Sequence, residues 1–280
     1  MKRLLLVICV LSMGSLARAQ TAPSLGTAAT FAVLGSSNVT CTAPGVISGD
    51  VGVSPGLFTN STGCLVVGTV HQGDLAASKA LIALNTAYQN ALVANSICTG
   101  SLADAPPTSF TLPPGVYCNT SAAGLTFTTI TLTLDAGGNA NAVWVFKIDH
   151  GLTGTGFHVV MANGGQPCNV YWLVGADSTF TGSTFQGNIL AGGPTGSFTS
   201  TDGTLIGRVL AKGAVTLTRP NLHGTCALAA QGGAGCKNDD DDRNDDDDRD
   251  KEKDHHDKDK DHHDKDKDRH DKDKDHRDDD

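Results

Sequence analysis

Short hydrophobic runs, separated by turn residues, account for most of the chain up to about residue 220. Between residues 25 and 70 the runs include FAVLG, VISGDVGVSPG and VVGTV, broken by Gly, Pro and Asn. From Phe110 to Thr218 the runs are rich in Val, Ile, Thr and Phe. Such runs predict short β-strands. The chain is therefore expected to be mainly β.

One segment follows a helical pattern instead. After Gly73 neither Gly nor Pro occurs until beyond Asn95, and Leu81, Leu84, Tyr88 and Leu92 recur at spacings of three or four. This pattern predicts one amphipathic helix over about residues 73–95. Asp74 is the expected N-cap.

Two regularities suggest that the strands stack in coils. TFQGNILAGG (184–193) recurs 20 residues later as TLIGRVLAKG (204–213). Thr-x-Thr pairs also recur at similar intervals: Thr131/Thr133, Thr153/Thr155, Thr179/Thr181, Thr199/Thr201 and Thr216/Thr218. A recurrence near 20 residues is typical of a solenoid, whose strands form several parallel sheets. The alternative is that Thr is frequent only because it favours strands.

In a solenoid, the threonine pairs would form an array. Alternate side chains of a strand point to the same face, so both Thr of a pair face one way. Neighbouring coils would place these pairs about 4.8 Å apart. The expected product is a flat lattice of hydroxyl and methyl groups.

The N-terminus has the features of a secretory signal peptide. Lys2 and Arg3 precede an apolar run that continues to Leu16, and Ala17-Arg18-Ala19 matches the small-x-small cleavage pattern. We therefore expect a signal peptide over residues 1–19 and a secreted, extracellular product. No later stretch has the apolar length of a membrane span, so no membrane insertion is expected.

Export permits disulfides, and seven cysteines follow the expected signal. An odd number leaves at least one without an intrachain partner. Cys98 and Cys118 bracket a polar, Pro-rich loop and are the preferred pair. Two further pairings are suggested by proximity alone: Cys41–Cys64 and Cys226–Cys236. Cys168, beside the apolar run NVYWLVG, is the expected buried free thiol.

The formal net charge of −9 is distributed unevenly. Residues 20–236 contain only five Lys or Arg and seven Asp. So few basic residues exclude a nucleic-acid interface and a polybasic membrane patch. The segment contains no GxSxG, HExxH or P-loop motif and no evident carboxylate cluster, so an enzyme is not expected.

Residues 237–280 form a separate, highly charged tail with 22 Asp, 1 Glu, 9 Lys and 4 Arg. The heptad DHHDKDK repeats there without an apolar position, which predicts disorder. His255, His256, His262 and His263 are candidate ligands for weak divalent-metal binding. Alternatives are a solubilising tail or a contact with cell-surface polymers. No other cofactor is implied.

Several blocks of the sequence together resemble one family. They include SLGTAATFAVLGSSNVT (24–40), HQGDLAASKA (71–80), LPPGVYC (112–118), NAVWVFKI (141–148) and GRVLAKGAVTL (207–217). In this order, across roughly residues 24–222, they are similar to the ice-binding-like family. The resemblance implies a secreted antifreeze fold, an irregular parallel β-solenoid with a single long helix packed alongside. This domain would occupy residues 20–236.

The family's Thr-Ala/Gly-x-Thr/Asn pattern appears as Thr181-Gly182-Ser183-Thr184, whereas Thr201-Asp202-Gly203-Thr204 departs from it. A rigid, uncharged array of Thr suits ice, because hydroxyls anchor water and restricted side chains lose little entropy. The candidate ice-binding residues, with Ser197 at the edge, are Thr153, Thr155, Thr179, Thr181, Thr184, Ser197, Thr199, Thr201, Thr216 and Thr218.

The resulting hypothesis is a secreted antifreeze protein that adsorbs to the ice crystal surface and inhibits ice growth and recrystallisation. The alternative is a non-catalytic cell-surface structural or adhesive module, whose tail binds cations or envelope polymers. A carbohydrate-binding or carbohydrate-degrading solenoid is a third interpretation.

Overall fold

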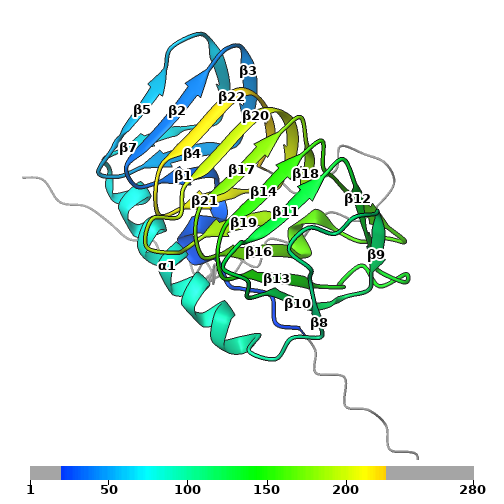
Figure 1. Ribbon diagram of the computed structural model, residues 1–280. Coiled ribbons are helices and arrows are strands. Elements are labelled where there is room, and N and C mark those ends of the chain that lie inside the picture. The colour runs from blue at the N-terminus through cyan, green and yellow to red at the C-terminus, as the bar shows by residue number, and fades with distance from the viewer. Residues whose placement is uncertain (1–19, 225–280) are drawn as a thin grey trace, which may run out of the picture. The chain divides into compact units, whose positions relative to one another are not determined.

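The structure is a computed structural model that describes residues 20–224 (Figure 1). The expected signal peptide, the Cys226–Cys236 pair and the charged tail lie outside the described residues. After a short 3-10 helix, η1 (Gly26–Thr30), the described chain forms strands and one α-helix. All strand pairings among them are parallel, which confirms the solenoid prediction.

One row of strands is a nine-stranded sheet in the order β7-β4-β1-β21-β19-β16-β13-β10-β8. Its members are β7 (Val70–Gln72), β4 (Asp50–Val53), β1 (Phe31–Gly35), β21 (Val209–Ala211), β19 (Asn188–Ala191), β16 (Val170–Val174), β13 (Trp144–Ile148), β10 (Gly115–Asn119) and β8 (Gly100–Ser101). Most of these strands are buried on both faces, which explains their continuous hydrophobic sequences.

Two further rows complete the coils. The second row contains β11 (Leu125–Thr128), β14 (Leu152–Thr155), β17 (Ser178–Thr181), the first halves of β20 (Phe198–Ile206) and β22 (Val215–His223), β2 (Asn38–Thr42) and β5 (Leu57–Asn60). The third row contains β9 (Phe110–Leu112), β12 (Thr131–Asp135), β15 (His158–Ala162), β18 (Thr184–Gln186), the second halves of β20 and β22, β3 (Gly45–Ser48) and β6 (Cys64–Val67).

The 20-residue repeat corresponds to two consecutive coils. Thr184 pairs with Thr204, Ile189 with Val209, and Ala191 with Ala211. The order of coils, however, does not follow the chain throughout. Strand β1 lies between β4 and β21, so the N-terminal coils stack on the last coil.

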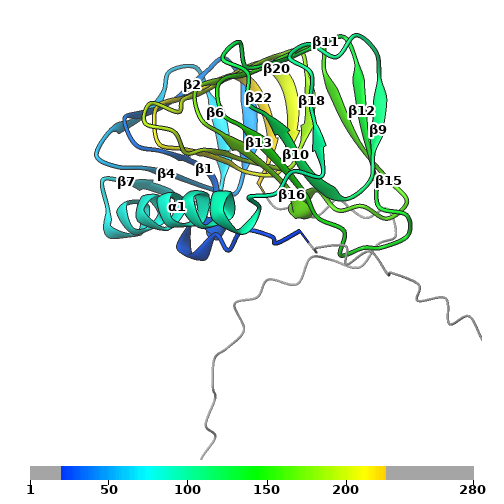
Figure 2. The ribbon, with the colours of Figure 1, turned by 60° about the horizontal axis from the view of Figure 1, so that its bottom comes forward.

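The helix α1 (Leu75–Ala94) returns the chain along the nine-stranded sheet, from the end of β7 to the start of β8. Its 20 residues span about 30 Å. The Asp74 carboxylate accepts a hydrogen bond from the Ala77 amide at 2.8 Å, which confirms the predicted N-cap. The helix packs against β1, β4, β7 and β16 (Figure 2).

Two hydrophobic cores hold these layers together. One fills the interior of the coils and contains stacked aromatic rings: Phe127 on Phe157, with centroids 4.2 Å apart, and Phe146 on Trp172 at 3.8 Å. The other lies between α1 and the nine-stranded sheet and includes the fully buried Leu84. Of the described helices, none combines the length and hydropathy needed to cross a bilayer.

The structure contains the preferred disulfide, Cys98–Cys118, and also Cys41–Cys64. The expectation for Cys168 is wrong, because this residue is disulfide-bonded rather than a free thiol. The apolar run that follows it suggested burial in a strand. Instead, Cys168 is half-buried in a short 3-10 turn, η2 (Pro167–Asn169), before β16 begins.

Candidate functional site

The second row of strands presents two parallel ladders of threonine. The first ladder consists of Thr126, Thr153, Thr179, Thr199, Thr216, Thr40 and Thr59. The second consists of Thr128, Thr155, Thr181, Thr201, Thr218 and Thr42. We call the outward surface of these strands the threonine face; the strands lie side by side in Figure 1. Its repeat is about 4.8 Å between rungs and about 6.7 Å within a pair.

The ladders face outward because the intervening residues fill the core. Phe127, Phe180, Leu217 and Cys41 are at most 3% exposed. Gly154 occupies the same inward place, and a Cβ there would meet the ring of Phe180 at 2.6 Å. The aromatic ring thus takes the space of the missing side chain, and the row continues without a bulge.

The hydroxyls of the threonine face are largely left for solvent. Among the described residues, the side-chain bonds of the ladders are those of Thr42, which contacts the Thr218 hydroxyl at 2.9 Å and donates to the Leu217 carbonyl at 3.5 Å. The face therefore offers regularly spaced hydroxyls and methyls, with no charged side chain in either ladder.

Along one rim, each second-ladder residue is followed by a corner residue with positive φ. The corners, with φ between +50° and +68°, are Thr129, Gly156, Gly182, Asp202, Arg219 and Ala43. The chain turns there from the second row of strands to the third. Asp202 and Arg219 form a two-pronged ion pair, Nε to Oδ1 and Nη2 to Oδ2. Arg219 holds the pKa of the Asp202 carboxyl below its usual range.

The opposite rim contains Ser197, the expected edge residue. Its hydroxyl donates to the Thr195 carbonyl at 3.0 Å and accepts from the Ala214 amide at 3.3 Å. Its own amide donates to the carboxylate of Asp177 at 2.9 Å. Ser197 thus borders the threonine face, but its hydroxyl holds the turn together.

The structure separates Thr184 from the other threonines proposed for the face. Thr184 follows the corner at Gly182 and lies in β18, where it pairs with His158 and Thr204. Thr131 and Thr133 belong to β12 in the same third row. The short motif does not reveal the change of direction at Gly182, and the Thr-x-Thr spacing does not reveal that at Thr129. The expectation of one shared surface is therefore wrong for Thr184, Thr131 and Thr133.

We call the outward surface of the third row the mixed face. One column of it runs through Thr131, His158, Thr184, Thr204, Asn221, Val46 and Leu65. Leu65, Val67 and Val160 are 57%, 55% and 42% exposed. The mixed face has the spacing of the threonine face but not its uniform chemistry.

Sequence reasoning missed five ladder threonines: Thr40, Thr42, Thr59, Thr126 and Thr128. Two Thr-x-Thr pairs, Thr40/Thr42 and Thr126/Thr128, carried the same signal as the pairs that were recognised. Thr59 stands alone in its strand and had no such signal.

Other chemistry is sparse in the described part of the chain. Residues 20–224 hold no group of three or more His, Cys, Asp or Glu that could bind a metal. The carboxyl pKa of Asp74 is lowered by the Ala77 amide and by His71, and that of Asp135 by the Gly137 amide and by Asn163. Both carboxylates serve a helix cap or a turn. The candidate ligands of the tail lie outside this range, so weak metal binding there stays a prediction.

Comparisons with known proteins agree on one family. The model of the family described as ice-binding-like matches residues 33–222. An ice-binding protein of Nostoc sp. (strain HG1) is 37% identical over 235 residues, covering 81% of this chain and 84% of its own. Ice-binding protein K1-A of Typhula ishikariensis is 34% identical over 217 residues, which cover 67% of this chain and 84% of the relative.

Solved structures give the same result for the fold. The crystal structure of an ice-binding protein from the Antarctic ascomycete Antarctomyces psychrotrophicus aligns with a TM-score of 0.63 at 29% identity, covering 72% of this chain and 98% of that one. The structure of an ice-binding protein from an Arctic yeast, described as the structural basis of that protein's antifreeze activity, aligns with a TM-score of 0.64 at 28% identity. The alignment covers 71% of this chain and 92% of that one.

Proposed function

The chain belongs to the ice-binding-like family, and from this premise we propose that it adsorbs to ice through the threonine face and inhibits ice growth and recrystallisation. The observation that carries the proposal is the pair of parallel threonine ladders, one of seven residues and one of six, on neighbouring strands of the second row. No bond is made or broken in this action, so the protein is not proposed to be an enzyme.

The physical argument concerns ordered water. A hydroxyl can anchor a water molecule, and the adjacent methyl leaves its neighbours few orientations other than those within a hydrogen-bonded cage. Because Thr is β-branched, its χ1 is restricted and little side-chain entropy remains to be lost on adsorption. Repeated at fixed spacing, these groups favour a water layer that merges with an ice surface.

We further propose that the protein acts outside the cell, supported by the signal-like N-terminus and by the Cys41–Cys64 and Cys98–Cys118 disulfides. The comparisons give no support to the adhesive-module alternative. A carbohydrate-degrading solenoid would need paired carboxylates at the site, and neither threonine ladder contains one.

A matched pair of substitutions tests the face assignment. Thr181 and Thr184 are three residues apart, on opposite sides of the Gly182 corner. In the full chain, Thr181→Tyr is expected to lower recrystallisation inhibition about tenfold, because a large ring in the centre of a contact surface prevents close approach. Thr184→Tyr on the mixed face is expected to retain activity. Circular dichroism would show that both variants fold. Equal activity in the two would overturn the assignment.

A further inference from the structure

Four of the six corners beside the threonine face hold a residue other than glycine at positive φ, and two of these four precede a proline. Arg219 and Ala43 have φ of +50° and +68°, where glycine is the favoured residue. Each also precedes a proline, Pro220 or Pro44, and a residue before proline is normally extended. Something other than local preference must hold these two corners.

Asp202 holds the Arg219 corner from the neighbouring coil. Both carboxylate oxygens accept hydrogen bonds from the guanidinium of Arg219. The pair is about half exposed, at 54% and 47% of the two side chains. Exposed ion pairs add little to the stability of a whole domain. The two-pronged geometry does, however, fix the orientation of a planar guanidinium, so its effect is expected to be local.

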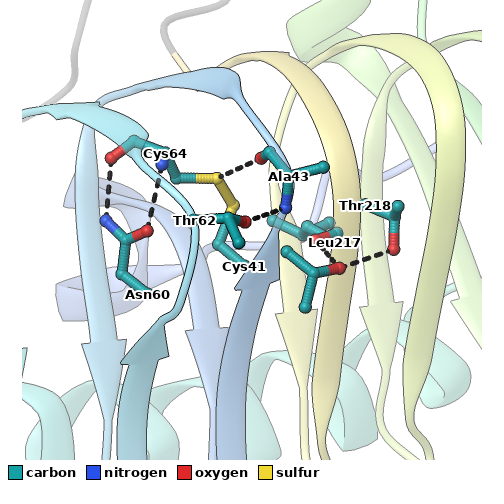
Figure 3. Close-up of a disulfide and its surroundings, with 8 residues drawn as sticks. Cys41, Ala43, Asn60, Thr62, Cys64, Leu217 and Thr218 are labelled. Atoms are coloured by element: carbon teal, nitrogen blue, oxygen red, sulfur yellow. Dashed lines mark hydrogen bonds between the residues drawn. A yellow bond between two sulfur atoms is a disulfide. The ribbon is translucent and has the colours of Figure 1, made fainter.

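The Ala43 corner is held by different groups with the same result (Figure 3). The Ala43 amide donates a hydrogen bond to the Thr62 hydroxyl. The Cys41–Cys64 disulfide joins the strand before the corner to the next coil. In contrast, Gly156 and Gly182 turn the chain at the equivalent place without a side chain. A dedicated clamp is therefore present at both corners where a residue precedes proline.

The clamped corners lie directly after ladder threonines. Thr201 precedes Asp202, and Thr218 precedes Arg219, on paired strands in the middle of the threonine face. A rotation of the Arg219 backbone would carry Thr218 with it and would also disturb Thr42, whose hydroxyl lies 2.9 Å from that of Thr218.

We propose that the Asp202–Arg219 pair is a positioning clamp that holds Thr201 and Thr218 in the register required for ice adsorption. The proposal rests on the proposed function of the threonine face. It also explains the departure from the Thr-Gly-x-Thr pattern: where Arg219 replaces glycine at a left-handed corner, Asp202 compensates for it.

Glycine rescue in the full chain tests the clamp. Asp202→Asn removes the charge that orients Arg219. It is expected to raise the protein concentration needed for recrystallisation inhibition about threefold, an effect no larger than the loss of an exposed ion pair can produce. Asp202→Asn/Arg219→Gly is expected to regain most of the lost activity, because glycine takes the left-handed corner unaided. Thermal unfolding midpoints should differ little among the three proteins, so a global loss of stability would not account for this pattern.

The outcomes separate the two proposals. A wild-type protein without activity would contradict the proposed function itself. An active wild type with an equally active Asp202→Asn variant would overturn the clamp alone. So would a double variant as weak as the single one. A single variant more active than the wild type would also overturn it, by showing that the charge pair opposes adsorption.

Discussion

The threonine face and the mixed face are built by the same coils, yet only one presents a uniform surface. Both consist of parallel strands in continuous register, and β20 and β22 contribute one half to each face. Both rest on the same core, with Phe180 below one face and Phe185 below the other, their ring centroids 4.7 Å apart. Spacing is therefore a property of the fold, and it cannot by itself distinguish the faces.

The difference lies in the outward side chains. On paired strands, the threonine face repeats Thr179, Thr199 and Thr216, whereas the neighbouring column of the mixed face changes from His158 to Thr184 to Leu65 along its length. Rings and long aliphatic chains protrude unequally and hydrate differently. If ice adsorbs as proposed, a uniform row of one small, branched, uncharged residue is what the threonine face has and the mixed face lacks.

The largest expected effect comes from interrupting that repeat at its centre. Thr199 lies on the fourth of the seven strands, and Thr199→Tyr is expected to lower recrystallisation inhibition about tenfold or more, as for a central contact residue. Thr59→Tyr, on the terminal strand β5, is expected to cost only about twofold, because rim contacts contribute less. Equal losses would show that the ladder does not act as one continuous surface.

The Cys41–Cys64 and Cys98–Cys118 disulfides should separate stability from activity. Each closes a loop of similar length, with sequence separations of 23 and 20, so removal of either is expected to cost about 2–4 kcal/mol. Cys41 lies between Thr40 and Thr42 in β2, with its side chain buried in the core beneath the threonine face. Cys41→Ala/Cys64→Ala should therefore also lower recrystallisation inhibition about threefold at temperatures where the fold persists. A loss of this size is what disturbance of a few contact residues would produce.

Cys98→Ala/Cys118→Ala is the matched control, since Cys118 belongs to β10 in the nine-stranded sheet. It should lower the unfolding midpoint by a similar amount while leaving recrystallisation inhibition at the wild-type level. If both double variants lost activity equally, the local role of the Cys41–Cys64 bond would be contradicted.

A smaller effect is expected from the core beneath the face. Gly154→Ala would place a Cβ 2.6 Å from the ring of Phe180, and such overpacking is expected to cost about 1–3 kcal/mol. Displacement of Phe180 would shift its neighbours Thr179 and Thr181 and reduce activity modestly. Ser200→Ala, in the inward position paired with Phe180 on β20, adds no volume and serves as the control in the same assays.

Much of this arrangement could be predicted from local patterns. The helix with its Asp74 cap, the parallel coils and the 20-residue repeat follow from periodicity and spacing, which are properties of short segments. The Thr-x-Thr pairs likewise predicted which residues face outward, because alternation along a strand requires no tertiary information.

The stacking of the N-terminal coils could not be predicted in this way. Thr40 pairs with Thr216, 176 positions away, and neither segment alone carries information about that neighbour. The misplacement of Thr184 has a related cause, since a single left-handed residue at Gly182 redirects the strand that follows. Cys168 was misjudged because hydrophobicity reports burial, whereas disulfide bonding depends on a distant cysteine.

The smallest expected effect is a dependence on pH at the rim of the threonine face. Arg219 holds the pKa of Asp202 below its usual range. Since the pKa is lowered by folding, the clamp is fully formed above the unfolded value of about 3.9 and is lost as pH falls through the folded value. Between pH 7 and 5, at least about one unit above the unfolded pKa, the clamp should stay formed and should cause no change in recrystallisation inhibition. The activity should weaken only in more acidic solution.

The Asp202→Asn/Arg219→Gly variant makes this dependence measurable against the rest of the molecule. Asp74 and Asp135 also have lowered pKa values, but they are present in both proteins, as are the titrating groups of the tail. The ratio of wild-type to variant activity therefore reports the contribution of the Asp202–Arg219 pair, separately from the other titrating groups. It should be constant down to about pH 5 and fall only in solution more acidic than the ordinary carboxyl pKa of about 3.9. A ratio that stayed constant to the lowest pH at which both proteins remain folded would mean that protonation of Asp202 leaves Thr201 and Thr218 in place.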